Sequence, residues 1–273
     1  MLPSTSCERF LMLLKDKVVI VSGIGPGLGI HLATIAAAEG ASVVLAGRTP
    51  AKLQAAEQAI RERGLDTAVL TVPTDIARAT ECGSLVARTI ERFGRIDALI
   101  NSAYVPGTLG PVETANLDNW RATFDVNLFG TLNLVQAVIP HMKHRRSGAI
   151  VNVNSQVVHK PLAGQGGYAA SKAALACATS YLALECGRHG IRVNSVFLGW
   201  MWGPAVAGYF EGLARELKTT VDALKQNVAE NIALGQIPAD RDCAKSVLYL
   251  ISDYASVVTG ASLDVNGGEY LPT

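Results

Sequence analysis

The chain has 273 residues, of which 49% are hydrophobic and 17% charged, and its formal net charge is +1. This near-neutral balance gives no argument for binding nucleic acid or an anionic membrane surface. The length fits one large α/β domain or two small ones, and the apolar share is enough to bury a parallel sheet.

The N-terminal stretch, MLPSTSCERFLMLLKDK, is the only candidate targeting segment. Its apolar run is too short to span a bilayer, and it lacks a basic start and a small-residue cleavage site. We therefore expect residues 1–14 to be an N-terminal extension and residues 15–273 to form a single domain. Met12 is an alternative start of the natural chain, because MLLKDKVVIVSG leads directly into a strand.

Short β-rich runs alternate with longer helical stretches along the rest of the chain. The expected strands are residues 17–22, 41–47, 67–72, 97–101, 148–154, 191–197 and 261–265. The expected helices include residues 30–39, 51–63 and 84–93, and a long helix that Asn116 caps and that runs through His141. Apolar strands that are each followed by a helix predict a doubly wound α/β fold, with a parallel sheet and helices on both faces. Residues from about 199 to 235 interrupt the alternation and are expected to form an inserted helical flap.

The segment SGIGPGLG, residues 22–29, follows the first strand and opens the first helix. Glycines at positions 23, 27 and 29 let the backbone turn tightly and approach a pyrophosphate, whose charge a helix N-terminus favours. Glycine-rich loops are common, but a dinucleotide site requires one between a first strand and a first helix. We therefore expect nucleotide binding at this turn.

The end of the second strand distinguishes the two nicotinamide cofactors. An NAD-binding site usually has an acidic residue there, about 20 residues further on, which binds the ribose 2′-hydroxyl. This sequence has Ala46, Gly47 and Arg48 instead, and Arg48 could pair with a 2′-phosphate. The alternative is that Arg48 is a solvated loop residue. We expect NADP(H) to be favoured, with NAD(H) possible.

The segment YAASK places Tyr168 and Lys172 four residues apart in an alanine-rich stretch that is expected to be helical. Residues four apart share a helix face, so the phenol and the ammonium can reach the same space. A free tyrosine, with a pKa of about 10, is a poor base, and a nearby ammonium lowers that pKa. The alternative is a surface tyrosine packed over a lysine stem.

Together these motifs resemble the short-chain dehydrogenase/reductase family, a single-domain Rossmann-type fold, over residues 15–268. The resemblance extends to Ser155, thirteen residues before Tyr168, to Asn127 in DVNLFG, and to the C-terminal DVNGG. It implies an NAD(P)(H)-dependent oxidoreductase that interconverts a secondary alcohol and a ketone. Tyr168 would be its acid/base, and Ser155 would hold the substrate oxygen. Lys172 would assist Tyr168 and bind the nicotinamide ribose, and Asn127 would support a water-linked proton path.

The resemblance also implies a set of cofactor-binding residues. Asp75 and Ile76 match the pair that contacts adenine in the family, and Asn101 matches the asparagine after the fourth strand. The whole expected set is Gly23, Gly27, Leu28, Gly29, Arg48, Asp75, Ile76, Asn101, Ala103, Tyr168, Lys172, Gly199 and Met201.

Three stretches depart from the family pattern near the expected site. The usual NNAG after the fourth strand is NSAY here, so Ser102 and Tyr104 replace an asparagine and a glycine. We expect Tyr104 either to narrow the pocket or to pack as an ordinary side chain. The usual Pro-Gly after the sixth strand is Leu198–Gly199, and Gly203 stands where a threonine often contacts the carboxamide. Gln156 replaces a common second serine and is expected to face the substrate.

The flap begins GWMWGPAVAGYFEGL, residues 199–213, which places several aromatic side chains just beyond the sixth strand. Parallel α/β sheets bind ligands at the carboxyl ends of their strands. We therefore expect an apolar pocket for a bulky, uncharged hydrophobic ketone or secondary alcohol, with one of the two tryptophans anchoring the flap instead. The expected substrate-binding residues are Ser155, Gln156, Tyr104, Trp200, Trp202 and Tyr209, with Phe210 beside them.

Two other functions stay open from the sequence. One is a 3-oxoacyl thioester reductase of fatty-acid type, and the other is a non-catalytic nucleotide-binding sensor, which would not need a proton relay. The two histidines near the end of the long helix, His141 and His144, lie among basic residues and complement the helix dipole, so we expect no metal.

The expected partners are a small-molecule substrate and further copies of the chain, with no nucleic acid and no membrane. A homotetramer, or at least a homodimer, would form through helices 116–141 and 167–187 and the C-terminal strand. The weakly charged face of the second helix is Ala173, Ala174, Cys177 and Tyr181. Five scattered cysteines without a CxxC pair are typical of reduced thiols in a cytoplasmic protein.

Overall fold

The computed structural model describes residues 12–272. Its centre is a sheet of seven strands in the order β3-β2-β1-β4-β5-β6-β7, and every pair of neighbouring strands is parallel. The strands are β1 (Val18–Ser22), β2 (Ser42–Gly47), β3 (Val69–Pro73), β4 (Ala98–Asn101), β5 (Gly148–Ser155), β6 (Ile191–Leu198) and β7 (Ser262–Val265). All seven expected strands are present with small shifts at their ends, and the doubly wound α/β fold is confirmed.

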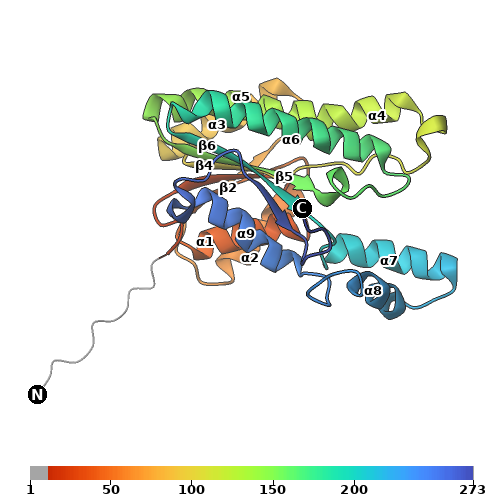
Figure 1. Ribbon diagram of the computed structural model, residues 1–273. Coiled ribbons are helices and arrows are strands. Elements are labelled where there is room, and N and C mark those ends of the chain that lie inside the picture. Colours follow the sequence, from red (N-terminus) through yellow and green to blue (C-terminus); the bar gives the residue numbers. More distant parts are fainter. Residues whose placement is uncertain (1–11, 273) are drawn as a thin grey trace, which may run out of the picture.

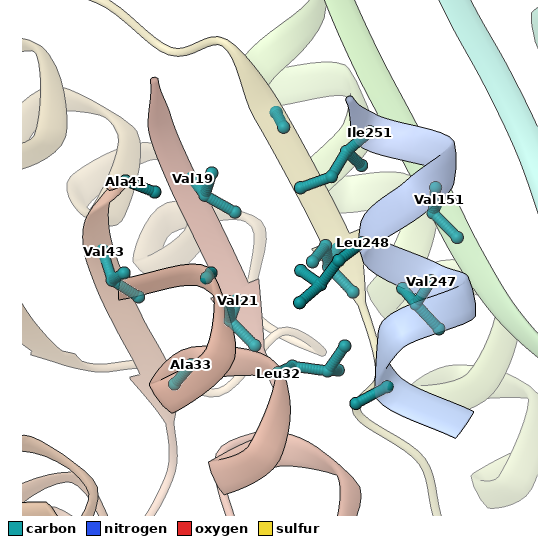
Figure 2. Close-up of a cluster of buried hydrophobic side chains, with 14 of the residues drawn as sticks. Val19, Val21, Leu32, Ala33, Ala41, Val43, Val151, Val247, Leu248 and Ile251 are labelled. Atoms are coloured by element: carbon teal, nitrogen blue, oxygen red, sulfur yellow. The ribbon is translucent and has the colours of Figure 1, made fainter. Parts of the chain in front are cut away.

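Helices cover both faces of the sheet (Figure 1). One layer consists of α1 (Leu28–Ala38), α2 (Pro50–Arg61) and α9 (Asp240–Ile251), and the other of α3 (Ala79–Phe93), α5 (Thr131–Arg145) and α6 (Gly166–Gly187). Val19 and Val21 of β1 pack into the first layer, as Figure 2 shows. Val18 and Ile20, which alternate with them, pack into the second. Burying each such side chain stabilises the fold by roughly 1.5–3 kcal/mol. Because helices cover both faces of the sheet, successive residues of a strand are all buried, and the strands are therefore apolar throughout.

The long helix expected from Asn116 to His141 is one helical run with a π-helical insertion. Asn116 caps the run as expected, with its side-chain oxygen accepting a backbone N–H at 2.8 Å. The run passes from α4 (Leu117–Phe124) through a π-helical turn (Asp125–Gly130) into α5. The expected end at His141 is wrong, because the helix continues to Arg145, where basic side chains in the last turn complement the helix dipole.

By length and composition alone, the helical run Leu117–Arg145 could cross a membrane. Within the fold, α5 packs against α3, and α4 packs against α6. Of the most apolar window of the run, 39% is buried by this packing. Contacts within the fold therefore bury part of the apolar surface of this run.

Leu13 and Leu14 belong to the domain and not to an extension. Leu14 is fully buried, and its backbone N–H donates to the Glu39 carbonyl at 2.9 Å. The backbone N–H of Leu13 donates to the Glu39 carboxylate at 2.8 Å. Leu13 and Leu14 therefore lie with the domain and not in the expected extension. The remainder of the expected extension, including Cys7, lies outside the described residues.

Two helices, α7 (Pro204–Leu217) and α8 (Val221–Ala229), occupy the stretch expected to be a flap. They lie to one side of the sheet, beyond the end of β6 (Figure 1). A small core of their own holds them together, with Phe210, Ile232 and Ile237 buried at its centre. The flap thus has its own small hydrophobic core and follows the carboxyl end of β6.

Candidate active site

A cavity of about 550 Å³ lies at the carboxyl ends of the strands. Its walls come from the segments that follow β1 to β7 and from α6, which is where a doubly wound sheet binds ligands. The expected site residues that line it are Gly23, Gly27, Leu28, Gly29, Arg48, Asp75, Ile76, Ala103, Tyr104, Ser155, Gln156, Tyr168, Lys172, Gly199, Trp200 and Met201. Five expected residues do not line it: Asn101, Asn127, Trp202, Tyr209 and Phe210.

The turn after β1 leaves open space because glycines occupy it, and a Cβ at these positions would fill that space. Gly23 has a φ of 89°, and a Cβ at this position would collide with the backbone of Ala103. Gly27 has a φ of 97° and immediately precedes α1. Positive φ values of this size favour glycine, and the first N–H groups of α1 have no partner within the helix. The turn therefore fits the pyrophosphate of a dinucleotide.

Two basic side chains line the cavity near the end of β2. Arg48 is exposed on this wall, as the sequence predicts. Lys52, in the first turn of α2, lies on the same wall and was missed. The available signal was its place in the first turn of the helix that follows β2, at the carboxyl end of the sheet. Asp75, which follows β3, lines this end of the cavity as well.

Tyr168 and Lys172 share one face of α6, and both reach the cavity. The Lys172 ammonium nitrogen lies 5.9 Å from the centre of the Tyr168 ring and 6.0 Å from that of Tyr104. The same nitrogen donates a hydrogen bond to the Val153 carbonyl at 2.7 Å. The spacing of YAASK therefore brings the phenol and the amine into one site, together with a second tyrosine that the family pattern does not contain.

Burial changes the acidity of both groups. Burial raises the pKa of Tyr168 well above its ordinary value, the neighbouring Tyr104 raises it further, and a hydrogen bond with Ser155 opposes the rise. Burial lowers the pKa of Lys172 to about 7. The pKa of Tyr168 is therefore raised and not lowered as expected, and desolvation by burial is the largest cause of the shifts of both Tyr168 and Lys172.

The two expected asparagines lie behind the cavity wall. Asn127, in the π-helical turn, is fully buried, and its amide nitrogen donates to the Val105 carbonyl and to the Ser171 hydroxyl, each at 3.0 Å. Its oxygen accepts the Val105 N–H at 2.8 Å. Asn101 donates to Asn152 at 2.9 Å within the sheet. Both side chains hold the wall together and do not face the cavity.

The aromatic side chains of the flap divide into two groups. Trp200 lines the cavity, and so does Tyr104. Trp202 packs against Phe210, with ring centroids 5.9 Å apart, and Tyr209 stacks on Trp200 at 6.1 Å, away from the lining. The expectation that Trp202 and Tyr209 line the cavity is wrong, because Trp202 packs into the small core of the flap and Tyr209 lies exposed on the far side of Trp200. The alternative that one tryptophan anchors the flap fits Trp202.

Asp240, the first residue of α9, lines the cavity and had no sequence signal. Its Oδ1 lies 3.2 Å from His31, while its Oδ2 is buried without a hydrogen-bond partner. A Cβ at Gly203 would collide with Oδ2, and one at Gly27 would lie 3.1 Å from it. The Asp240 carboxylate therefore occupies the space that the family's threonine side chain would need at position 203.

No group of three or more metal-ligating side chains occurs within residues 12–272. The cysteines in this part of the chain are free thiols: Cys82, Cys177, Cys186 and Cys243. Burial raises the pKa of Cys82 and of Cys243 to about 11, so neither is a nucleophile at neutral pH.

The fold agrees with comparisons to known proteins. A family model described as enoyl-(acyl carrier protein) reductase matches residues 23–269. Levodione reductase of Leifsonia aquatica is 32% identical over 256 residues, which cover 93% of this chain and 94% of that protein. The chain belongs to the short-chain dehydrogenase/reductase family. As a member, it is an NAD(P)-dependent oxidoreductase that acts on alcohol and carbonyl groups.

Other members of the short-chain dehydrogenase/reductase family are similar over nearly their whole length. A 3-oxoacyl-[acyl-carrier-protein] reductase of Staphylococcus aureus is 31% identical over 257 residues, covering 93% of this chain and 98% of that protein. The crystal structure of levodione reductase has a TM-score of 0.88 at 32% identity, covering 94% and 98% of the two chains. L-sorbose reductase from Gluconobacter frateurii, solved with NADPH and L-sorbose, has a TM-score of 0.89 at 26% identity, covering 95% and 98%.

Proposed function

We propose that the chain reduces a ketone with a hydride from NADPH and that Tyr168 donates the proton. The observation that carries this proposal is the buried phenol at the cavity wall. Because burial raises its pKa, Tyr168 keeps its proton at neutral pH and is an acid before it is a base. Bound NADPH would supply a hydride to the carbonyl carbon and become NADP⁺. Tyr168 would give its phenolic proton to the carbonyl oxygen, so that the product is a secondary alcohol.

Three further side chains assist Tyr168 in this proposal. Ser155, its hydrogen-bond partner, holds the substrate oxygen. Lys172 has a pKa of about 7, so a substantial share of it is an ammonium near neutral pH and can return a proton to the phenolate. Asn127 supports this proton path from behind, because its hydrogen bonds fix the segment that carries Tyr104. The intact set argues against a nucleotide sensor, which has no use for a proton donor.

The test is Tyr168→Phe, with Tyr104→Phe as the matched control, since both tyrosines line the cavity. We expect Tyr168→Phe to lower kcat at least a hundredfold while leaving the dissociation constant for NADPH within threefold, in line with the usual size of acid catalysis of about 10²–10⁴. Tyr104→Phe should retain most of kcat. A Tyr168→Phe enzyme with kcat near the wild-type value contradicts the mechanism.

The preference for NADP(H) over NAD(H) rests on the two cations near the end of β2. Arg48 and Lys52 suit a 2′-phosphate, because charged pairs with phosphate oxygens are stronger than neutral hydrogen bonds. We expect kcat/KM for NADPH to exceed that for NADH at least tenfold, which is about 1.4 kcal/mol. The double variant Arg48→Ala with Lys52→Ala should remove that preference. An unaltered preference would exclude these two residues as its source.

The proposed substrate is a hydrophobic, ring-sized ketone. The substrate half of the cavity is lined by Tyr104, Leu109, Leu162 and Trp200, which are apolar over most of their surface. The second candidate, a 3-oxoacyl thioester reductase, is favoured by the similarity to the Staphylococcus aureus enzyme. It would need a basic rim for an acidic carrier, whereas the flap supplies few cations, such as Lys225. Reduction of an alicyclic ketone, compared with a 3-oxoacyl thioester at equal concentration, decides between them.

We also propose a homotetramer or homodimer in the cytoplasm. An exposed stripe along α6, formed by Ala173, Cys177, Tyr181 and Leu184, supports association, with Tyr181 62% and Leu184 78% exposed. Apolar stripes of this kind are common at subunit interfaces. A monomeric mass by light scattering at micromolar concentration would refute the assembly. The free thiols fit a reducing compartment, and fractionation of the host cell tests the location.

A further inference from the structure

Three polar side chains line the cavity at the end opposite the glycine turn. They are Gln156, directly after β5, Lys160, four residues later, and Glu269, after β7. In the sheet order β7 is the edge strand furthest from β2 and β3, beside which Arg48 and Asp75 lie. The three side chains are therefore on the substrate side of the cavity and not on the nucleotide side.

These side chains form one hydrogen-bonded group around the Glu269 carboxylate. Gln156 donates its amide N–H to one carboxylate oxygen at 2.5 Å, and the Lys160 ammonium lies 3.1 Å from the other. The Glu269 side chain is only 8% exposed, and Gln156 is buried. Burying a carboxylate this deeply costs free energy unless the carboxylate is paired. Gln156 and Lys160 supply that pairing, so the three side chains form a defined part of the cavity wall.

Several donors and acceptors of these three side chains have no hydrogen-bond partner among the described residues. The Gln156 side-chain oxygen is buried and has no donor. Each carboxylate oxygen of Glu269 has one of these two partners, although a carboxylate can accept about four hydrogen bonds. Lys160 has further N–H donors, since an ammonium carries three and its side chain is 44% exposed. An unpaired buried acceptor is unfavourable, which leaves a place for a ligand that donates.

We propose that Gln156, Lys160 and Glu269 form a polar subsite that binds a neutral hydroxyl group of the substrate, remote from the carbonyl that is reduced. This inference rests on the proposed function and narrows its substrate to a hydroxyketone, or the corresponding diol, on an apolar ring. It adds Lys160 and Glu269 to Gln156, which the sequence already places beside the substrate, as polar anchors in an otherwise apolar pocket.

The charge balance selects a hydroxyl over a charged group. Lys160 offsets the charge of Glu269, so neither a carboxylate nor an ammonium of the substrate meets a net opposite charge. A hydroxyl can donate to the carboxylate or to the Gln156 oxygen and can accept from Lys160. A substrate that lacks the hydroxyl leaves these groups unpaired, and sites built to bind a hydroxyl discriminate strongly against analogues without one.

The alternative is that these hydrogen bonds have a structural role only and hold the C-terminal segment, which carries Glu269, against the segment after β5. A fastening role predicts that its removal weakens the binding of every ketone by the same factor. A subsite predicts a selective loss for the hydroxylated ketone. The ratio of the two substrates therefore separates the readings.

The experiment measures kcat and KM for cyclohexanone and for its 2-, 3- and 4-hydroxy derivatives with NADPH. We expect at least one hydroxyketone to exceed cyclohexanone tenfold or more in kcat/KM, through a lower KM. Glu269→Leu and Gln156→Leu should each reduce that ratio to below threefold. The control is Glu62→Leu, which disrupts a similar Gln–Glu pair (Gln58 to Glu62, 3.0 Å) outside the cavity and should keep the ratio.

The inference is overturned if no hydroxyketone exceeds cyclohexanone threefold, or if the variants change both substrates by equal factors. A binding measurement tests the subsite independently of the proposed catalytic function. Saturation-transfer NMR with NADP⁺ present compares cyclohexanediols with cyclohexanol, and a preference for a diol that Glu269→Leu abolishes supports the subsite even without turnover. Absence of turnover for all the ketones counts against the proposed function, whereas equal binding of diol and alcohol counts against the subsite.

Discussion

Replacing the buried lysine with methionine should stabilise the protein at neutral pH. Lys172 is 3% exposed, and burial lowers its pKa from 10.5 to about 7. Between these values the unfolded chain binds a proton that the folded chain does not, so stability rises with pH across this window. Below pH 7 the penalty for burying the ammonium is complete, and it disappears as the pH approaches 10.5.

The magnitude follows from the shift and from one lost hydrogen bond. A shift of roughly 3.5 units corresponds to at most about 5 kcal/mol. Lys172→Met leaves the Val153 carbonyl without the donor that now lies at 2.7 Å, which costs about 1–3 kcal/mol. The net gain at pH 7 is therefore on the order of 2–4 kcal/mol, or roughly 5–15 °C in Tm for a domain of this size.

The assay is denaturant unfolding of the wild type and of Lys172→Met at pH 6.5, 8 and 9.5. At pH 9.5 about one unit of the shift remains, worth about 1.4 kcal/mol, so the advantage of the variant should vanish or reverse. Taking the difference between the two proteins cancels the titration of groups that lie far from Lys172. A difference that stays constant with pH, or widens as pH rises, would refute the reasoning.

The other predictions concern the walls of the cavity. Gly23→Ala should weaken NADPH binding at least tenfold by fluorescence titration, because its Cβ collides with backbone at a φ of 89°. Gly203→Ala should cost about 1–3 kcal/mol of unfolding free energy through contact with Asp240, and clearly less when combined with Asp240→Ala, as a double-mutant cycle in urea will show. Trp200→Ala should raise KM for a ring ketone more than Trp202→Ala does, while Trp202→Ala should lower Tm, since only Trp200 lines the cavity. Equal KM effects of the two substitutions would contradict that division.

The long helix illustrates where sequence reasoning stops. The pattern around Asn116 predicts its start, because a cap depends on neighbouring residues only. The π-helical turn at Asp125–Gly130 was not predicted, since DVNLFG contains no local signal for an extra residue per turn. The turn coincides with a buried Asn127, whose amide bonds to Val105 and Ser171. Such insertions are frequent at functional sites, and here distant contacts accompany it.

By itself the sequence determined the features that depend on local pattern. Continuous apolar strands separated by helices predict the parallel sheet, the glycine spacing predicts the turn at its edge, and the four-residue spacing within one helix predicts that Tyr168 and Lys172 share a site. Each of these follows from the period of a helix or strand or from the freedom of a glycine.

Only the tertiary structure decided which residues meet across the fold and how burial changes their acidity. The approach of Asp240 to Gly203, the bond from Gln156 to Glu269 and the division of the tryptophans all join segments far apart in the chain. The pKa of Tyr168 rises because surrounding elements exclude water from it. Desolvation depends on everything packed around a group, so no local spacing can report it.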